Sequence, residues 1–228
     1  MELVTWLNES GIEVTKKQIK QFEQYYDFLI SKNQVMNLTT ITEKEEVYHK
    51  HFIDSLFLMK AIDFKNQKFL DVGSGAGFPS IPLKIIFPKI EVTIIDSLQK
   101  RITFLEELVS ILEIDNIRLI HGRIEEFKEK ETFDVVSARA LARLNLLAEF
   151  CIPFVKTNGY FIAMKSLHYE EELNEAKKAI ELLGGAICEP YKYDLSNELT
   201  HVLIPIKKIH SSEMKYPRNF GSMKKRPL

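Results

Sequence analysis

The chain has 228 residues, of which 45% are hydrophobic and 28% are charged, so it is long enough to bury a substantial core as one globular unit. Its formal net charge of −1 excludes a global electrostatic attraction to polyanions, and any nucleic-acid surface must therefore be a local patch. The two cysteines, Cys151 and Cys188, provide neither a disulfide framework nor a metal site, which indicates a cytoplasmic protein. No apolar run approaches the roughly 20 residues that span a bilayer, so we expect no membrane partner.

Residues 1–60 are predicted to form a helical cap. Two stretches, 15–33 and 45–62, carry apolar side chains at three- and four-residue spacing, which is typical of one buried helix face. These side chains are Ile19, Phe22, Tyr26 and Leu29 in the first stretch and Val47, Phe52, Leu56 and Met59 in the second. We therefore expect core packing here, including for the tyrosines near residue 26, rather than a base-stacking surface.

Residues 61–210 alternate between strand and helix signals, which predicts an α/β domain. The expected strands are 68–72, 91–96, 117–122, 133–141, 159–166, 186–195 and 200–208, and the expected helices are 79–87, 97–112 and 169–185. Alternation of this kind indicates a mostly parallel, seven-stranded sheet with helices on both faces. The last two strands are predicted to pair antiparallel, and residues 211–228 show no periodicity and are predicted to form a basic tail.

A glycine-rich loop follows the first predicted strand. Its spacing is Asp71-x-Gly73-x-Gly75-x-Gly77, at the carboxyl end of the strand, where ligands bind in open parallel sheets. Glycine lets the backbone approach a ligand without a Cβ in the way, although a purely structural strand-to-helix turn is an alternative. A dinucleotide fingerprint would need a glycine where Phe78 stands, which disfavours a nicotinamide dehydrogenase.

Asp96 ends the next predicted strand. A carboxylate at this place can accept both hydroxyls of a bound ribose. The alternative is that Asp96 caps the following helix, but Ser97 can serve as that cap equally well. Together with the glycine loop, Asp96 favours a nucleoside ligand that lacks a pyrophosphate, such as S-adenosylmethionine, over NAD.

Several segments resemble one protein family. They are "DVGSGAGFPSIPLKI", "DSLQKRITFLEEL", "FDVVSARALARL", "NLTTITEKEEVYHKHFIDS" and the terminal "KYPRNFGSMKKRPL". Together they resemble the ribosomal RNA small-subunit methyltransferase G family, also called glucose-inhibited division protein B, nearly end to end. The resemblance implies a class I, Rossmann-like fold, S-adenosylmethionine as cofactor, and methylation of guanine N7 in small-subunit (16S) ribosomal RNA, free or in a ribosomal particle.

The resemblance also implies roles for individual residues. Guanine N7 presents a neutral lone pair, so its methylation needs alignment rather than a strong base. Arg139, directly after the fourth predicted strand, would be the catalytic residue, and His51, Asp54 and Ser55 would support the cofactor loop. The expected cofactor-binding residues are Asp71, Gly73, Gly75, Gly77, Phe78, Asp96, Ile124, Glu125 and Arg139.

Cations near the same edge and in the tail are predicted to bind RNA. They are Lys100, Arg101, Arg123, Arg143, Lys165, Lys215, Arg218, Lys224, Lys225 and Arg226. Because Pro217, Gly221 and Pro227 argue against a helix, we expect an extended tail whose removal weakens RNA binding and leaves cofactor affinity unchanged. We also expect a monomer.

Two other functions stay open from the sequence. The first is a class I methyltransferase that acts on a protein or a small molecule. The second is a non-catalytic RNA-binding module for ribosome assembly, although such a module would have no evident need for the intact glycines and Asp96.

Overall fold

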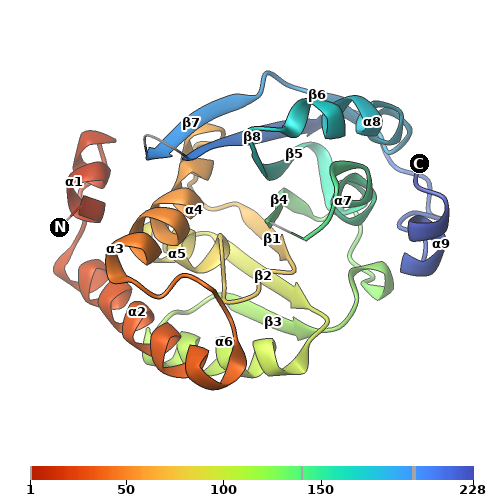
Figure 1. Ribbon diagram of the computed structural model, residues 1–228. Helices are drawn as coiled ribbons and strands as arrows, with labels where there is room; N and C mark the ends of the chain where they lie inside the picture. Colours follow the sequence, from red (N-terminus) through yellow and green to blue (C-terminus); the bar gives the residue numbers. More distant parts are fainter. Residues whose placement is uncertain (1, 140, 197–198) are drawn as a thin grey trace.

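In the computed structural model, which describes residues 2–139, 141–196 and 199–228, one sheet separates the helices into two groups (Figure 1). The strands are β1 (Lys68–Val72), β2 (Glu91–Asp96), β3 (Ile117–His121), β4 (Phe133–Arg139), β5 (Val155–Ser166), β6 (Gly185–Ile187), β7 (Tyr191–Ser196) and β8 (Leu199–Lys208). The order is β3-β2-β1-β4-β5-β8-β6, with β7 also paired to β8. The first five strands in this order are parallel, and β8 runs antiparallel to β5. The α/β class and the mostly parallel sheet are confirmed.

The sheet has eight strands, one more than predicted, because the expected strand 186–195 is divided. Both pieces, β6 and β7, pair antiparallel with the same edge of β8. Pro190 lies between them and has no N–H to donate to a sheet ladder. The sheet therefore keeps seven positions across, and the last of them is shared by two short strands.

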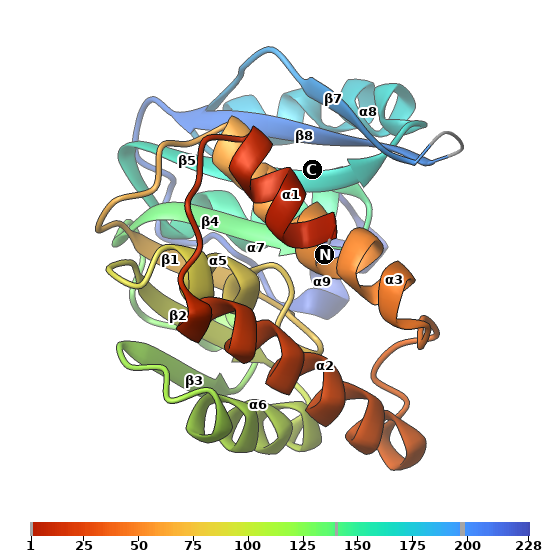
Figure 2. The same ribbon diagram turned by 90° about the vertical axis from the view of Figure 1, so that its left-hand side faces the viewer.

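Helices from the first half of the chain cover one face of the sheet (Figures 1 and 2). They are α1 (Glu2–Glu9), α2 (Lys16–Met36), α3 (Lys44–Val47), a π-helical stretch η1 (Tyr48–Ile53), α4 (Asp54–Leu56), a 3₁₀ turn η2 (Phe57–Lys60), α5 (Ser80–Ile86) and α6 (Gln99–Ile111). The opposite face carries α7 (Leu144–Cys151), α8 (Tyr169–Leu182) and α9 (Phe220–Lys225), and two short 3₁₀ turns are η3 (Ile124–Glu126) and η4 (Ile152–Phe154). None of the helices in the described ranges is long and apolar enough to cross a bilayer.

The predicted helical cap is part of the same hydrophobic core as the sheet. A capping box between Thr15 and Gln18 begins α2, and Asn37 ends it in the left-handed conformation at φ 51°. One cluster of buried side chains runs from Phe22 on α2 to Ile94 on β2. The division into segments 1–60, 61–210 and 211–228 stays a prediction, but no gap in the packing marks residue 60.

The prediction of an extended tail without a helix was wrong. Residues Phe220–Lys225 form α9, and the Asn219 side chain caps it by accepting a hydrogen bond from Ser222 N at 2.9 Å. Gly221 lies in the first turn and Pro227 follows the last, so neither interrupts the helix. Met223, 0% exposed, packs into the core beside α7 and α8, and this burial decides the conformation.

Candidate functional site

The glycine loop leaves β1 with all three glycines at positive φ, 72° at Gly73, 62° at Gly75 and 101° at Gly77. Gly73 N donates to Ile95 O at 2.8 Å, which ties the loop to β2. A Cβ on Gly77 would lie 2.7 Å from Ile81 Cγ1 and 2.9 Å from the Tyr25 hydroxyl, whereas a Cβ on Gly75 would meet nothing within 4 Å. The loop is thus packed from behind at Gly77 and presents bare backbone to open space at Gly75.

This contrast gives a matched pair of substitutions. Gly75→Ala is expected to cost about 1–2 kcal/mol of stability, because it adds only the strain of a left-handed alanine. Gly77→Ala carries the same strain and also overpacks a buried site, which adds about 1–3 kcal/mol. Thermal or urea unfolding of the two variants checks the order. Equal stability of the two would show that the packing behind Gly77 yields easily.

Two acids flank the loop. Asp71 is fully buried at the end of β1, its Oδ2 accepts from Ser80 N at 3.2 Å, and its Oδ1 has no partner among the described residues. Burial raises the pKa of Asp71 to about 7. Asp96, 3% exposed, ends β2, and its Oδ2 lies 3.4 Å from Gly75 N. Asp71 is therefore enclosed behind the loop, and Asp96 lies beside the unobstructed backbone of Gly75.

Asp96 uses its two oxygens differently. Oδ1 accepts from Leu98 N at 2.9 Å in a turn that precedes α6. The N-cap of α6 is Leu98 and carries no side-chain cap hydrogen bond, so neither Asp96 nor Ser97 caps this helix. Oδ2 forms an ion pair with Arg101 Nη1 at 3.2 Å. Arg101 therefore pairs with the oxygen that is the candidate acceptor for a ribose hydroxyl.

A cavity of about 280 Å³ opens beside Asp96. Its walls come from the ends of β1, β2, β3 and β4 and from α7 and α9, and include Gly73, Asp96, Ile124, Glu125, Leu141 and Phe220. The Asp96 carboxylate, the apolar walls and the bare backbone at Gly73 suit a nucleoside, whose ribose needs an acceptor and whose base needs apolar cover. Four predicted cofactor residues meet here, whereas neither Leu141 nor Phe220 was predicted to bind the cofactor.

Of the remaining predicted cofactor residues, Phe78 lies against Arg139, which ends β4. Its guanidinium lies over the Phe78 ring at 5.4 Å, Nη1 lies 3.0 Å from Asp54 Oδ2, and Nη2 lies 2.6 Å from His51 Nδ1. The side chain is 18% exposed, so part of it faces outward. Arg139 is therefore a permanent cation beside Phe78, the residue after Gly77. Asp54 and His51 hold it in place.

His51 serves Arg139 as an acceptor. Burial, and then the charge of Arg139, lowers the pKa of His51 to about 4, so the ring is neutral. Nδ1 lies 3.0 Å from Lys50 O as well as beside Arg139, but a guanidinium can only donate, which assigns Nδ1 as the acceptor and leaves Lys50 O to accept from Arg139 Nη2 at 3.3 Å. Nε2 then donates to Thr39 Oγ1 at 2.8 Å, and the ring stacks on Phe78 at 4.6 Å. The predicted support role of His51 thus acts on Arg139 as well as on the loop.

Asp54 is the counter-ion of this centre and has two partners that the sequence did not reveal. Tyr193 donates its hydroxyl to Oδ1 at 2.7 Å from β7, and His201 Nδ1 lies 2.8 Å from the same oxygen on β8. Burial by itself raises the pKa of Asp54, but the hydrogen bond from His201 and the charge of Arg139 outweigh it and hold the pKa below its usual value. Ser55 donates to His51 O at 2.5 Å.

The predicted RNA-binding cations fall into two groups. Seven lie against protein acceptors: Lys100 on Met36 O, Arg101 on Asp96, Arg123 on Glu125, Arg143 on Glu175, Lys165 on Glu172, Lys215 on Glu213 and Arg218 on Glu149. In the part of the chain that the structure describes, Lys224, Lys225 and Arg226 on and after α9 have no acidic partner. These three are the cations most available to phosphate, and an RNA contact by any of the ten stays a prediction.

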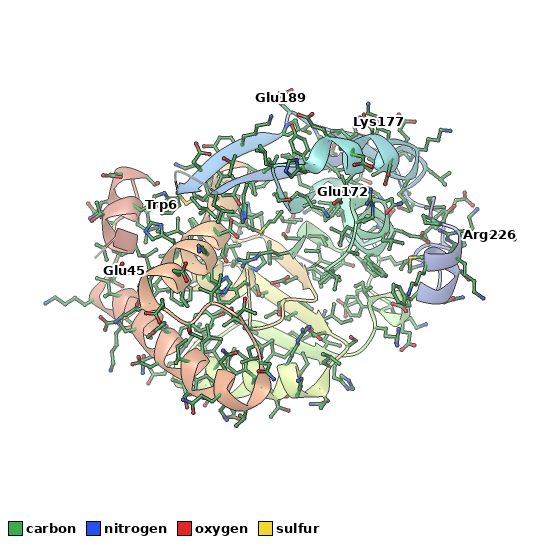
Figure 3. The ribbon with its side chains drawn as sticks, in the orientation of Figure 1. Trp6, Glu45, Glu172, Lys177, Glu189 and Arg226 are labelled. Atoms are coloured by element: carbon green, nitrogen blue, oxygen red, sulfur yellow. The ribbon has the colours of Figure 1, made fainter. Side chains whose placement is uncertain are left out.

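Lys165 and Arg218 are the most enclosed of these cations. Lys165 Nζ lies 2.6 Å from Glu172 Oε2 and donates to Ala142 O at 2.8 Å, with a side chain 13% exposed. Figure 3 shows Glu172 between α8 and α7, whereas Arg226 lies at the outer side of α9. Arg218 forms a two-fold hydrogen bond with Glu149, whose side chain is 1% exposed. An RNA phosphate would have to displace the half-buried Glu172 carboxylate from Lys165 or the buried Glu149 carboxylate from Arg218.

No group of three or more His, Cys, Asp or Glu side chains within the ranges 2–139, 141–196 and 199–228 is placed to hold a metal ion.

Comparison with known sequences identifies relatives along the whole chain. The family model described as rRNA small subunit methyltransferase G matches residues 18–190. A protein named ribosomal RNA small subunit methyltransferase G from Lactococcus lactis subsp. lactis (strain IL1403) is 48% identical over 233 residues, covering 100% of this chain and 98% of the relative. The protein of the same name from Bacillus subtilis (strain 168) is 47% identical with the same coverage.

Comparison with solved structures identifies the fold. M. jannaschii TYW2 in complex with AdoMet has a TM-score of 0.56 at 17% identity, covering 68% of this chain and 77% of that one. A SAM dependent methyltransferase from Aquifex aeolicus also has a TM-score of 0.56 at 17% identity, covering 71% of this chain and 92% of that one. The architecture is that of class I S-adenosylmethionine-dependent methyltransferases.

Proposed function

This chain belongs to the rRNA small subunit methyltransferase G family, and on that premise we propose that it transfers a methyl group to N7 of a guanine in 16S ribosomal RNA. It is an S-adenosylmethionine-dependent methyltransferase, and the cofactor supplies an activated methyl group on sulfur. The observation that carries the proposal is the Asp96 carboxylate facing the bare backbone of Gly75 at the mouth of an apolar cavity. We further propose that the protein acts as a cytoplasmic monomer.

In this proposal, different residues contact different parts of the cofactor. Asp96 accepts the ribose hydroxyls, and Ile124 and Glu125 line the cavity at the adenine. The loop from Gly73 to Gly77 would hold the remainder of the cofactor, with Asp71 enclosed behind the loop. The orphaned Oδ1 of Asp71 is an acceptor available to a donor at that end.

The surroundings of Arg139 suit a nucleophile that needs no deprotonation. Arg139 cannot act as a base, and the Nδ1 lone pair of His51 is occupied by its guanidinium. Guanine N7 attacks with an existing lone pair, so catalysis rests on alignment. A guanidinium can donate to O6, the acceptor beside N7, and would then orient the base without covering the attacking atom. Asp54 neutralises the arginine, which limits repulsion of the positive charge that reaches the purine.

The direct test is nucleoside mass spectrometry of small-subunit ribosomal RNA. RNA from cells that lack the protein is expected to lose one 7-methylguanosine per molecule, and the wild-type gene is expected to restore it. Other modified nucleosides in the same RNA serve as internal controls. Unchanged 7-methylguanosine would refute the proposed substrate. Incubation of the purified protein with free 16S RNA and with assembled small subunits then distinguishes the two substrate forms.

A further inference from the structure

Helix α9 and the nucleoside cavity share a wall. Phe220 and Lys224, which lie one turn apart on α9, line the same cavity as Asp96 and Ile124. We propose that the C-terminal segment is part of the cofactor site, with the Phe220 ring covering the adenosine end of S-adenosylmethionine. This inference rests on the cofactor site and not on the RNA substrate proposed above, so it survives if another substrate is found.

The segment is fixed firmly enough to form such a wall. Arg218 N and Nε donate to Glu149 Oε1 at 2.9 and 2.8 Å, and Arg218 Nη2 donates to Glu149 Oε2 at 2.6 Å. Charge-assisted bonds to a buried carboxylate are the strong ones, and they attach the start of the segment to α7. Tyr216 and Met223 are 3% and 0% exposed, so the segment is held on both sides of Phe220.

Phe220 is the one large apolar side chain of α9 that keeps an exposed surface. Its ring stacks on Phe150 of α7 at 6.0 Å, and Phe150 lines the cavity as well. Phe220 nevertheless remains 38% exposed, and it lines the cavity. A planar base entering the cavity would cover that surface, which is the way aromatic rings bind other ring systems.

The cations of the C-terminal segment take different positions relative to the cavity. Lys224 lines it, together with Asp96 and Glu125, while Arg226 lies at the outer side of the segment (Figure 3). A basic tail that served only as an RNA arm would have no reason to direct a phenyl ring into the cavity. We therefore expect that removing residues 211–228 weakens cofactor binding, contrary to the expectation from the sequence.

Point variants test this better than truncation, because truncation would leave the buried Glu149 without Arg218. Phe220→Ala is expected to weaken S-adenosylmethionine binding about three- to tenfold, the range of an aromatic contact. Phe220→Leu should recover part of the loss. Ser222→Ala, at an exposed position of the same helix, is the matched control and should bind as the wild type does. Isothermal titration calorimetry with S-adenosylmethionine and S-adenosylhomocysteine, without RNA, gives the affinities, and thermal unfolding confirms that each variant is folded.

A second experiment uses the wild-type chain. Trypsin cleaves after Lys224 and Lys225, and saturating S-adenosylmethionine should slow both cuts, because the cofactor ties α9 to the cavity. Intact-mass spectrometry follows the C-terminal fragments, and cleavage after the exposed Lys17 on α2 is the control. A folded Phe220→Ala protein with wild-type affinity, or α9 cuts whose rate is the same with and without cofactor, would overturn the inference. Loss of RNA methylation alone would not bear on it.

Discussion

Asp96→Ala is expected to weaken S-adenosylmethionine binding by about ten- to a hundredfold. The ribose loses a charged acceptor, and a hydrogen bond to a charged group contributes about 1.5–3 kcal/mol. The carboxylate is nearly buried, and its Oδ2 faces Gly75 and Arg101. A bound ribose would replace Arg101 as the partner of this oxygen. Calorimetry on the purified protein measures the change directly.

The same substitution should leave the protein folded. Leu98 N, just before α6, loses its hydrogen-bond acceptor, a loss of about 1 kcal/mol. Asp96→Asn keeps the shape of the side chain and one acceptor oxygen. Its affinity for S-adenosylmethionine should therefore lie between those of the wild type and Asp96→Ala. Asp115→Ala removes an exposed acid from the loop before β3 and serves as the control for a general loss of charge. Equal affinity in the wild type and Asp96→Ala would show that the ribose lies elsewhere.

Arg139→Ala is expected to lower the rate of methyl transfer about a hundredfold while changing cofactor affinity only a few-fold. A small misplacement of reacting atoms is enough for a rate loss of this size. Arg139 does not line the nucleoside cavity, so the adenosine contacts remain. Single-turnover methylation of ribosomal RNA at saturating cofactor separates the chemical step from binding.

The cost to stability needs its own control, because Arg139→Ala leaves the buried Asp54 without its counter-ion. Removing one partner of a buried ion pair costs about 3–5 kcal/mol, but Asp54 keeps Tyr193 and His201 as donors, which places the cost at the lower end. The double variant Arg139→Ala with Asp54→Asn removes both charges and should regain stability without regaining turnover. A folded Arg139→Ala enzyme with the wild-type rate would make Arg139 a structural residue only.

Local signals in the sequence were enough to predict much of the cofactor site. Strand, loop and helix alternate between residues 68 and 112, and each element is defined by neighbours a few residues away. The positive φ angles at Gly73, Gly75 and Gly77 and the place of Asp96 at the end of β2 follow from that short segment. Parallel strands bring their carboxyl ends to one edge, so the meeting of Asp96 with Ile124 was also foreseeable.

What the sequence by itself determined is therefore the α/β class, the glycine loop and the acid at the end of the second strand, because hydrophobic period and glycine spacing are local properties of a chain. Only the tertiary structure decided the partners of Arg139 and the position of the tail. His51 reaches Arg139 across 88 residues, and Glu149 reaches Arg218 across 69. Such contacts form where separate elements pack, and no local propensity encodes them. Pro217 and Pro227 lie outside α9, so only Gly221 disfavours the helix, and the burial of Met223 together with the pairing of Arg218 with Glu149 outweighs that cost.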